Sequence, residues 1–326
     1  MIEILSYPRL HACLLDLAGV TGRKFGGAGF TIDGLPTRVF VDKGAQMDIR
    51  VEEEDPALAD CIAMAAHRTS TYLGRHLPAI VRVAPPTARH VGLGSCTAVV
   101  LGFLEGMRRC FDLPLTPYDI RRISGRGGTS GIGINTFFAG GFVVDGGHPQ
   151  DKSGIFLPSS SGARHSIPPV MFRSDIPKYW RFYLYVPQNG ILISGTEEAT
   201  FFRANAPVPA PDVYQSISAV YHSLCPAVHY DNLQLLRSAL SKISSLGFKR
   251  REIDGQSKDV RLLLDAFSGY PNCAVGMSSM GPLVYVVADL NDDEFRLYAE
   301  RVITDVPVTY LGSYPGRNSG FGVSSD

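Results

Sequence analysis

Two glycine-rich stretches combine hydroxyl groups and a cation in a pattern that suits phosphate. The first, HVGLGSCTA at residues 90–98, contains Gly92, Gly94, Ser95 and Thr97 and joins an expected strand to an expected helix. A helix that begins here would direct free N–H groups and a partial positive charge at an anion. The lysine of a P-loop and the G-x-G-x-x-G dinucleotide fingerprint are both absent. The pattern therefore favours a phosphate site of another kind, with a ligand-free helix cap as the alternative.

The second stretch, GRGGTSGIG at residues 125–133, places glycines around one arginine and two hydroxyl residues. Successive glycines let backbone N–H groups converge on an anion, and a guanidinium can grip a phosphate through two hydrogen bonds. A flexible surface loop is the alternative, but a second glycine loop so close in the chain favours phosphate. The residues expected at this site are Arg126, Gly127, Gly128, Thr129, Ser130 and Gly131.

Two further stretches carry titratable side chains on expected strands. VVDGGH at residues 143–148 ends in Asp145, two glycines and His148. Asp145 could hold a metal, orient His148 or face a developing cation, and the alternative is a tight turn whose aspartate binds its own backbone. In RLHACLLDL, strand alternation places Arg9 and His11 on one face and Asp16 on the other, unless a bulge intervenes. For each of these residues the alternative is an edge position or a satisfied, partly buried ion.

The elements that must position these residues mix strands and helices without a strict β-α-β alternation, which predicts the α+β class. Asp55 and Pro56 indicate a helix start, because aspartate accepts hydrogen bonds from free N–H groups and proline suits the first turn. The polar, proline-rich segment 147–177 favours an active-site loop or a connection between two lobes. Strands are expected at 2–5, 10–17, 37–41, 79–84, 140–147, 181–187 and, as the final strand, 306–312. Helices are expected at 55–74, 94–110, after 116, near 211–224, 230–246 and 256–268, and from 292, and residues 272–290 predict a turn, a glycine-serine loop and a buried strand.

Composition excludes several classes of protein. The 326 residues carry 31 basic and 31 acidic side chains, so no basic excess draws the chain to nucleic acid or anionic lipid. At 45% hydrophobic and 19% charged residues the chain can bury a large core, which excludes wholesale disorder. The start lacks a signal-peptide pattern, and no apolar run is long enough for a membrane span. The six scattered cysteines, without a C-x-x-C pair, predict reduced thiols in a cytoplasmic protein.

Taken in order, the motifs resemble one enzyme family. GLGS after a strand and Pro-Pro, together with GMSSMGP at 276–282, is similar to the first and third motifs of the GHMP kinase superfamily. The match is closer to a non-kinase branch, the β-ribofuranosylaminobenzene 5′-phosphate synthases. That branch resembles this chain through R-x-H, D-L-x-G at 16–19, GLGS-x-T, GRGG-x-SGIG, GGFxVDGGH, P-A-V at 226–228 and GMSS-x-GP-x-VY. Cys96 departs from the pattern, because a small glycine is expected after GLGS.

The resemblance implies a GHMP-kinase-like α+β fold with two lobes, residues 1–170 with the glycine-rich phosphate loops and residues 171–326. It also implies a transferase that joins phosphoribosyl pyrophosphate to an aromatic carboxylic acid through a carbon–carbon bond, with loss of pyrophosphate and carbon dioxide. Known members use 4-hydroxy- or 4-aminobenzoate, and a bacterial branch for the C-nucleoside antibiotics formycin and pyrazofurin uses a 4-aminopyrazole dicarboxylate. We favour the pyrazole because the composition lacks the charge enrichment of many hyperthermophilic proteins.

The resemblance also assigns roles to residues. Arg9 and His11 would hold the aromatic acid, and the catalytic set would be Asp16, Asp145 and His148, with the two aspartates facing the cationic sugar or a metal. Mg²⁺ is expected to accompany the pyrophosphate. The phosphate loops named above and Ser278 and Ser279 would bind substrate. A homodimer is a further expectation. A GHMP small-molecule kinase and a non-catalytic binding protein of the same fold are the alternatives.

Overall fold

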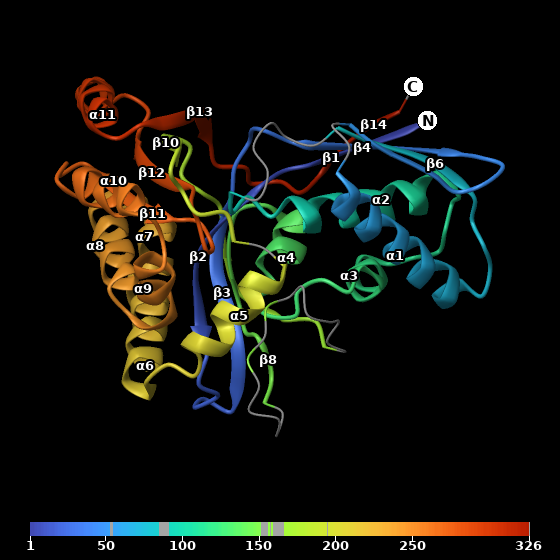
Figure 1. Ribbon diagram of the computed structural model, residues 1–326, viewed down its shortest axis with the longest axis horizontal. Coiled ribbons are helices and arrows are strands. Elements are labelled where there is room, and N and C mark those ends of the chain that lie inside the picture. Colours follow the sequence, from blue (N-terminus) through green and yellow to red (C-terminus); the bar gives the residue numbers. More distant parts are fainter. Residues whose placement is uncertain are drawn as a thin grey trace.

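The computed structural model describes residues 1–52, 55–84, 91–150, 156, 158, 166–193 and 195–325. Three sheets with helices packed against them form the molecule, and the central sheet runs between an amino-terminal and a carboxy-terminal layer (Figure 1). Among the described strands, neighbours pair antiparallel except for β5 with β6, which pair in parallel. The α+β class is therefore confirmed.

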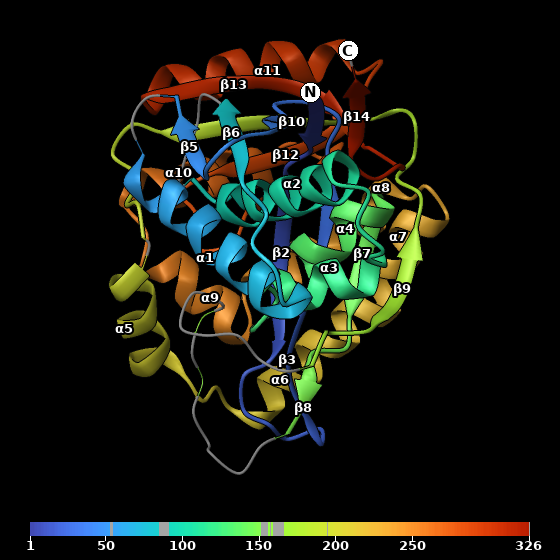
Figure 2. The same cartoon turned by 90° about the vertical axis from the view of Figure 1, so that its right-hand side faces the viewer.

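The amino-terminal sheet supports the helices that carry the first glycine loop. Its strand order is β14 (Gly322–Ser325), β1 (Ile2–Ser6), β4 (Thr37–Lys43), β6 (Ala79–Ala84) and β5 (Asp48–Val51). Both chain ends therefore lie in this sheet, side by side (Figure 2). Helix α2 (Ser95–Cys110) packs closely on β4, because a Cβ at Gly102 or Gly106 would lie 2.9 or 2.5 Å from the side chains of Val39 and Val41.

Local signals in the sequence fix the ends of the neighbouring helices. Helix α1 (Pro56–Leu73) begins at Asp55, whose side chain accepts a hydrogen bond from the Leu58 N–H, and ends at Gly74 with φ +65°. Helix α3 (Pro117–Ser124) begins with a capping box in which Thr116 and Asp119 bond reciprocally. These predicted helices are confirmed.

The central sheet contains a strand that the sequence analysis missed. Its order is β2 (Arg9–Asp16), β3 (Arg23–Thr31), β7 (Phe142–Asp145) and β9 (Val170–Ser174), and β8 (His148–Pro149) also pairs with β3. Glycines weaken the strand signal of β3, yet the packing requires them. A Cβ at Gly27 would lie 2.8 Å from both His11 Nε2 and Ser130 Oγ, and one at Gly29 would lie 2.7 Å from the side chain of Ile132.

Helix α4 (Ile132–Ala139) was also missed, since the second glycine loop was expected to lead directly into a strand. Its short sequence follows four loop glycines and contains a fifth, Gly133, so the local helix signal was weak. The helix packs on β3 and β7, and it turns the chain between the glycine loop and β7. The glycine loop is consequently held at the amino-terminal end of a buried helix.

The carboxy-terminal layer combines a sheet with most of the remaining helices. The sheet order is β11 (Cys273–Met277), β12 (Val284–Asp289), β10 (Trp180–Pro187) and β13 (Val308–Pro315). Phe30 of the central sheet contacts Phe182 and Tyr285 of this sheet, with ring centroids 5.4 and 6.4 Å apart, so one core joins the two sheets. The helices are α5 (Gly195–Asn205), α6 (Ala210–Ala219), a π-helical turn (Val220–Leu224), α7 (Cys225–His229), α8 (Leu233–Ser244), α9 (Gly247–Asp254), α10 (Lys258–Ser268) and α11 (Asp293–Asp305).

Most expected elements of the second half are confirmed, with several corrections. Residues 273–277 form a strand where a turn was expected, and β13 is followed by the further strand β14. Helices α5, α7 and α9 and strand β9 were not predicted. Three parts of the sequence analysis lie outside the described residues: the Pro-Pro pair at 85–86, His90 at the start of the first glycine stretch, and much of the segment 147–177. The division at residue 170 stays a prediction, and β pairing crosses it at β7–β9, at β1–β14 and at the isolated bridge between Ile32 and Gly316. Among the described helices, none is both long and apolar enough to cross a membrane.

Candidate active site

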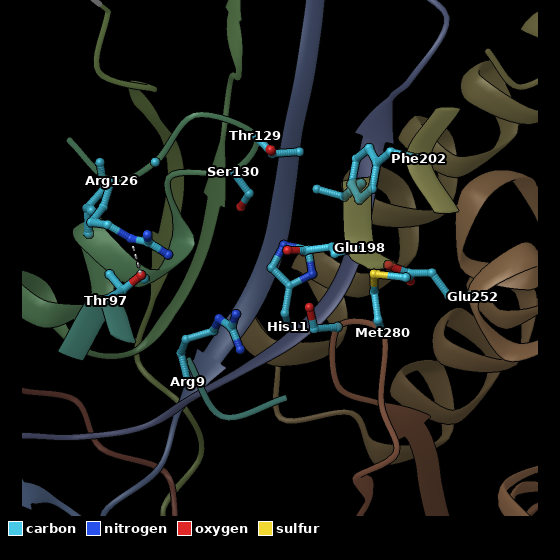
Figure 3. A pocket seen from close by; sticks show the side chains of 15 residues that line it. Arg9, His11, Thr97, Arg126, Thr129, Ser130, Glu198, Phe202, Glu252 and Met280 are labelled. Carbon is cyan, nitrogen blue, oxygen red and sulfur yellow. Dashed lines mark hydrogen bonds between the residues drawn. The ribbon is translucent and has the colours of Figure 1, made fainter. Parts of the chain in front are cut away.

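Two adjoining cavities lie where the central sheet meets both glycine loops. The inner chamber has a volume of about 110 Å³ and the outer chamber about 380 Å³. In the inner chamber, Arg126 and Thr97 lie across the space from Phe202 and Glu252 (Figure 3). The residues that line both chambers, and so form their junction, are Arg9, Thr97, Arg126, Glu198, Ser279 and Met280.

His11 is a buried wall of the inner chamber. Its backbone is fixed by Ser278 and Ser279, since the His11 N–H donates to Ser278 Oγ at 3.0 Å and the His11 carbonyl accepts from the Ser279 N–H at 3.0 Å. Burial lowers the pKa of the imidazole well below its usual value, and the charges of Arg9 and Lys249 act in the same direction. The ring is therefore neutral at pH 7, and its buried Nδ1 has no hydrogen-bond partner among the described residues.

Arg9 supplies a half-buried cation at the junction of the chambers. Its Nη1 donates to the Gly92 carbonyl at 2.5 Å, and its backbone N–H donates to the Leu93 carbonyl, so β2 is tied to the first glycine loop. Burial lowers the pKa of the guanidinium to about 10, which still leaves it charged at neutral pH. Gly94 is required here, because its φ is +81° and a Cβ would lie 3.1 Å from Arg9 Cζ.

The two glycine loops form one site. Arg126 Nε donates to Thr97 Oγ1 at 3.1 Å, which joins the second loop to the first turn of α2. Gly127, Thr129 and Ser130 line the inner chamber beside Arg126, whereas Gly92, Gly94 and Ser95 line the outer chamber. Gly128 and Gly131 belong to the second loop but line neither chamber.

Asp145 and His148 hold the second glycine loop from behind and line neither chamber. Asp145 accepts hydrogen bonds from Ser130 Oγ at 3.0 Å and from the Gly131 and Gly147 N–H groups at 2.9 Å. His148 Nε2 contacts the Gly127 carbonyl at 2.8 Å, and its Nδ1 contacts Ser166 Oγ at 2.6 Å. The structure gives both residues contacts that position the loop, and the catalytic role expected for them stays a prediction. Burial raises the pKa of Asp145 to about 7, against the hydrogen bonds that lower it.

Asp16 is not brought to the chambers. The anticipated bulge is present, because the β2–β3 register shifts between His11 and Cys13, so Leu14 joins the face that carries Arg9 and His11. Asp16 lies at the end of the strand, where its carboxylate accepts from the Ala18, Gly19 and Thr21 N–H groups and from Thr21 Oγ1. These contacts match the structural alternative, a carboxylate that caps its own turn.

The two serines of the GMSS stretch have different surroundings: Ser278 is buried, and Ser279 lines the chambers. Ser278 is fully buried and donates to the Gly92 carbonyl at 2.8 Å, so it braces the first glycine loop without lining a chamber. Ser279 lines both chambers, and Lys249 Nζ donates to its carbonyl at 2.7 Å. Lys249 Nζ also forms an ion pair with Glu252 Oε2 at 2.5 Å. Burial raises the pKa of the Glu252 carboxyl above its usual value, although Lys249 acts in the opposite direction.

Several lining residues were missed by the sequence analysis. Glu198 and Phe202 come from α5, and Glu252 from α9. They stand in ordinary helical sequences without a motif, so only the tertiary fold shows that they reach the site. The outer chamber adds a wall from α1 and its surroundings, formed by Ala57, Leu58, Cys61, Met64, Cys96, Ile193 and Gly195.

A resident metal site is not evident in the described part of the chain, where no three His, Cys, Asp or Glu side chains converge. Mg²⁺, however, is commonly held by one or two carboxylates together with substrate phosphates. Glu198 at the junction and Glu252 in the inner chamber are the carboxylates present in the lining. The donor set therefore fits a cation that arrives with a phosphate-bearing substrate.

Comparison with solved structures gives the fold. A phosphomevalonate kinase from Streptococcus pneumoniae has a TM-score of 0.70 at 13% identity, and the match covers 96% of this chain and 98% of that one. A homoserine kinase from Cytophaga hutchinsonii has a TM-score of 0.64 at 11% identity, covering 99% and 97%. These likenesses confirm the GHMP-kinase-like, two-lobed α+β fold.

Comparison with curated proteins gives the family. No family model matches the sequence. β-Ribofuranosylphenol 5′-phosphate synthase from Archaeoglobus fulgidus is 34% identical over 89% of each chain. The proteins of the same name from Methanothermobacter thermautotrophicus and Methanocaldococcus jannaschii are 33% and 31% identical, over 86% and 91% of this chain and 87% and 95% of their own. At this identity over most of its length, the chain belongs to the β-ribofuranosylphenol 5′-phosphate synthase family, whose members are pentosyltransferases that form a C-glycosidic bond.

Proposed function

We propose that this enzyme joins phosphoribosyl pyrophosphate to an aromatic or heteroaromatic carboxylic acid and releases pyrophosphate and carbon dioxide. The observation that supports this proposal most is that Arg9, the neutral His11 and Arg126 all line the inner chamber. A ring carbon would attack the anomeric carbon as the bond to pyrophosphate breaks. Loss of carbon dioxide from that ring carbon restores aromaticity, so no strong base is needed. This agrees with the described lining of both chambers, which includes no lysine.

The different sizes of the chambers support a division between the two substrates. The outer chamber, with the start of α2, Ser95 and Arg126, suits the sugar phosphates, because helix N-termini and guanidinium groups bind anions. The inner chamber is small enough to select one ring, with His11 and Leu14 among its walls. The reacting carbons would then meet at the junction, where preorganised donors and positioning supply most of the catalysis.

For the acid we propose a heteroaromatic dicarboxylate such as 4-aminopyrazole-3,5-dicarboxylate. A guanidinium that is partly removed from water is stabilised by an anion beside it, and Arg9 is half-buried at the junction. A dicarboxylate keeps one carboxylate for Arg9 after the other is lost as carbon dioxide. A benzoate would keep none, although Glu198 also favours the charge on Arg9. The alternative is 4-hydroxy- or 4-aminobenzoate, and the curated relatives are named for a ribosylated phenol.

Mg²⁺ is part of the proposal as a companion of the pyrophosphate. Glu198, with Glu252 behind it, would hold the ion, which would neutralise charge that develops on the leaving pyrophosphate. We also propose a cytoplasmic location, since all six cysteines are free thiols. The homodimer stays a prediction that sedimentation would test.

The test is to incubate the protein with phosphoribosyl pyrophosphate, Mg²⁺ and each candidate acid in the absence of ATP. We expect pyrophosphate and carbon dioxide in equal amounts with the correct acid only. ATP-dependent phosphorylation of a small alcohol, without pyrophosphate release, would favour the kinase alternative. Binding of phosphoribosyl pyrophosphate without turnover of any acid would indicate a non-catalytic binding protein.

A further inference from the structure

The outer chamber contains a pair of thiols that the proposed reaction does not use. Cys61 lies on α1 and Cys96 is the second residue of α2, and the two thiols lie close enough to affect each other's ionisation. Both are half-buried and line the outer chamber. Cys96 stands between Ser95 and Thr97, at the position where the family pattern leads us to expect glycine. Two thiols from different helices therefore meet at the proposed phosphate loop.

The surroundings make the two thiols unequal. The neighbouring Cys61 thiol lowers the pKa of the Cys96 thiol, and the charges of Arg126 and Arg68 act in the same direction, against burial and Asp55. A position in the first turn of a helix also favours a thiolate. The same pairing raises the pKa of Cys61. Cys96 is thus the nucleophile of the pair, and Cys61 is the neighbour that can resolve an oxidised Cys96.

We propose that Cys61 and Cys96 form an oxidisable dithiol site that reacts with hydrogen peroxide and closes to a disulfide. The Cys96 thiolate attacks one peroxide oxygen, the O–O bond breaks, and water and a sulfenic acid result after proton transfer. Cys61 sulfur then attacks the Cys96 sulfur, the S–O bond breaks, and a second water leaves. Two thiols are oxidised by two electrons, and one peroxide is reduced to two water molecules.

The consequence rests on the proposed function of the outer chamber. A disulfide would tie α1 to the first turn of α2 and would alter that turn, which carries Ser95 and Thr97. Because Arg126 donates to Thr97 Oγ1, the second glycine loop would be affected as well. Oxidation would therefore weaken binding of phosphoribosyl pyrophosphate, and a reducing agent would restore it.

The first experiment maps the thiols and does not depend on activity. The folded protein is treated with hydrogen peroxide at a small molar excess, alkylated, digested and analysed by mass spectrometry. We expect a Cys61–Cys96 linked peptide in the wild type and in Cys110→Ser, which removes another half-buried thiol at the far end of α2. Cys61→Ser should give no linked peptide and should instead accumulate a sulfenic acid at Cys96, trapped by dimedone. Absence of the linked peptide from folded, peroxide-treated wild type would overturn the proposal, as would faster oxidation of Cys110 than of Cys96.

The second experiment measures binding by calorimetry, with phosphoribosyl pyrophosphate and with inorganic pyrophosphate as separate probes. We expect at least a tenfold weaker affinity in the oxidised protein, full recovery with dithiothreitol, and at least fivefold slower alkylation of Cys96 when the probe is saturating. An unchanged affinity in protein shown to be cross-linked would refute the effect on binding. If the reduced protein binds neither probe, the proposed function fails, while the thiol map still decides whether the dithiol site exists.

Discussion

The second glycine loop and the wall of the outer chamber are built in contrasting ways. The loop is anchored from behind by the fully buried Asp145 and by His148, both through hydrogen bonds. The outer wall is formed by the faces of two helices, with Leu58 and Met64 beside the thiols of Cys61 and Cys96. Directional bonds fix a loop in one geometry, whereas apolar packing between helices allows small displacements. The chamber proposed for the ring is thus the rigid one, and the outer wall is the part that chemistry could change.

The largest expected effect comes from removing Asp145, which anchors the second glycine loop. Asp145→Ala leaves the Ser130 hydroxyl and the Gly131 and Gly147 N–H groups without their acceptor, so we expect the free energy of unfolding to fall by about 3 kcal/mol. Turnover should fall with it, because the loop loses its position. Urea unfolding followed by circular dichroism, together with pyrophosphate release, measures both quantities.

The matched control for Asp145 is Asp16→Ala, which removes a carboxylate with a similar number of donors but away from both chambers. We expect a loss of about 1–2 kcal/mol in unfolding free energy with unchanged KM values. If Asp16→Ala remained folded yet lost turnover, the catalytic role first expected for Asp16 would be supported after all.

The next effect tests Arg126, one of the two arginines that line both chambers. Arg126→Ala should weaken binding of phosphoribosyl pyrophosphate by about 1.5–3 kcal/mol, the range for hydrogen bonds to a charged group. Calorimetry measures this directly, and Arg126→Lys should retain part of the affinity, because it keeps the charge and loses the two-pronged geometry. Wild-type affinity in folded Arg126→Ala would remove this residue from the site.

Arg9→Met tests whether the aromatic acid and the sugar phosphates occupy different chambers. We expect the KM for the aromatic acid to rise about tenfold, or roughly 1.4 kcal/mol, with phosphoribosyl pyrophosphate binding nearly unchanged. Steady-state kinetics with each substrate varied in turn gives both values, and a thermal melt checks the bond to Gly92 that is lost. The reverse pattern, with weakened sugar-phosphate binding and normal acid KM, would mean that the two substrates occupy the chambers in the opposite order.

The smallest effect is a pH dependence from Asp145. Its pKa is raised to about 7 by burial, above the value of an unfolded chain, so the folded state holds a proton that the unfolded state has released. Stability from this group is therefore complete below about pH 4 and is lost as the pH rises through 7, with about 1 kcal/mol lost between pH 6 and 7. Urea titrations of the wild type and of Asp145→Asn at both pH values would isolate this contribution. An equal pH dependence in the two proteins would show that Asp145 is already ionised when folded.

Local sequence was sufficient for many elements and for part of the site. Asp55 with Pro56 and Gly74 set the ends of α1, and Thr116 with Pro117 set the start of α3. The spacing of Arg9 and His11 placed both on the chamber face of β2. These features depend on neighbours within a few residues, such as caps, turns and strand alternation, so the sequence alone indicates them.

Other features depend on contacts between distant segments, and only the tertiary structure decided them. Strand β3 was missed because Gly27 and Gly29 are poor strand residues, yet their missing side chains make room for His11, Ser130 and α4. Glu198 of α5 and Glu252 of α9 reach the chamber because helices far along the chain pack against the central sheet. Asp145 and His148 were recognised as special from sequence, but whether they face substrate or support a loop depends on which side of the loop they occupy. The pattern of residues along one segment determines what that segment can form, and packing against other segments determines what it touches.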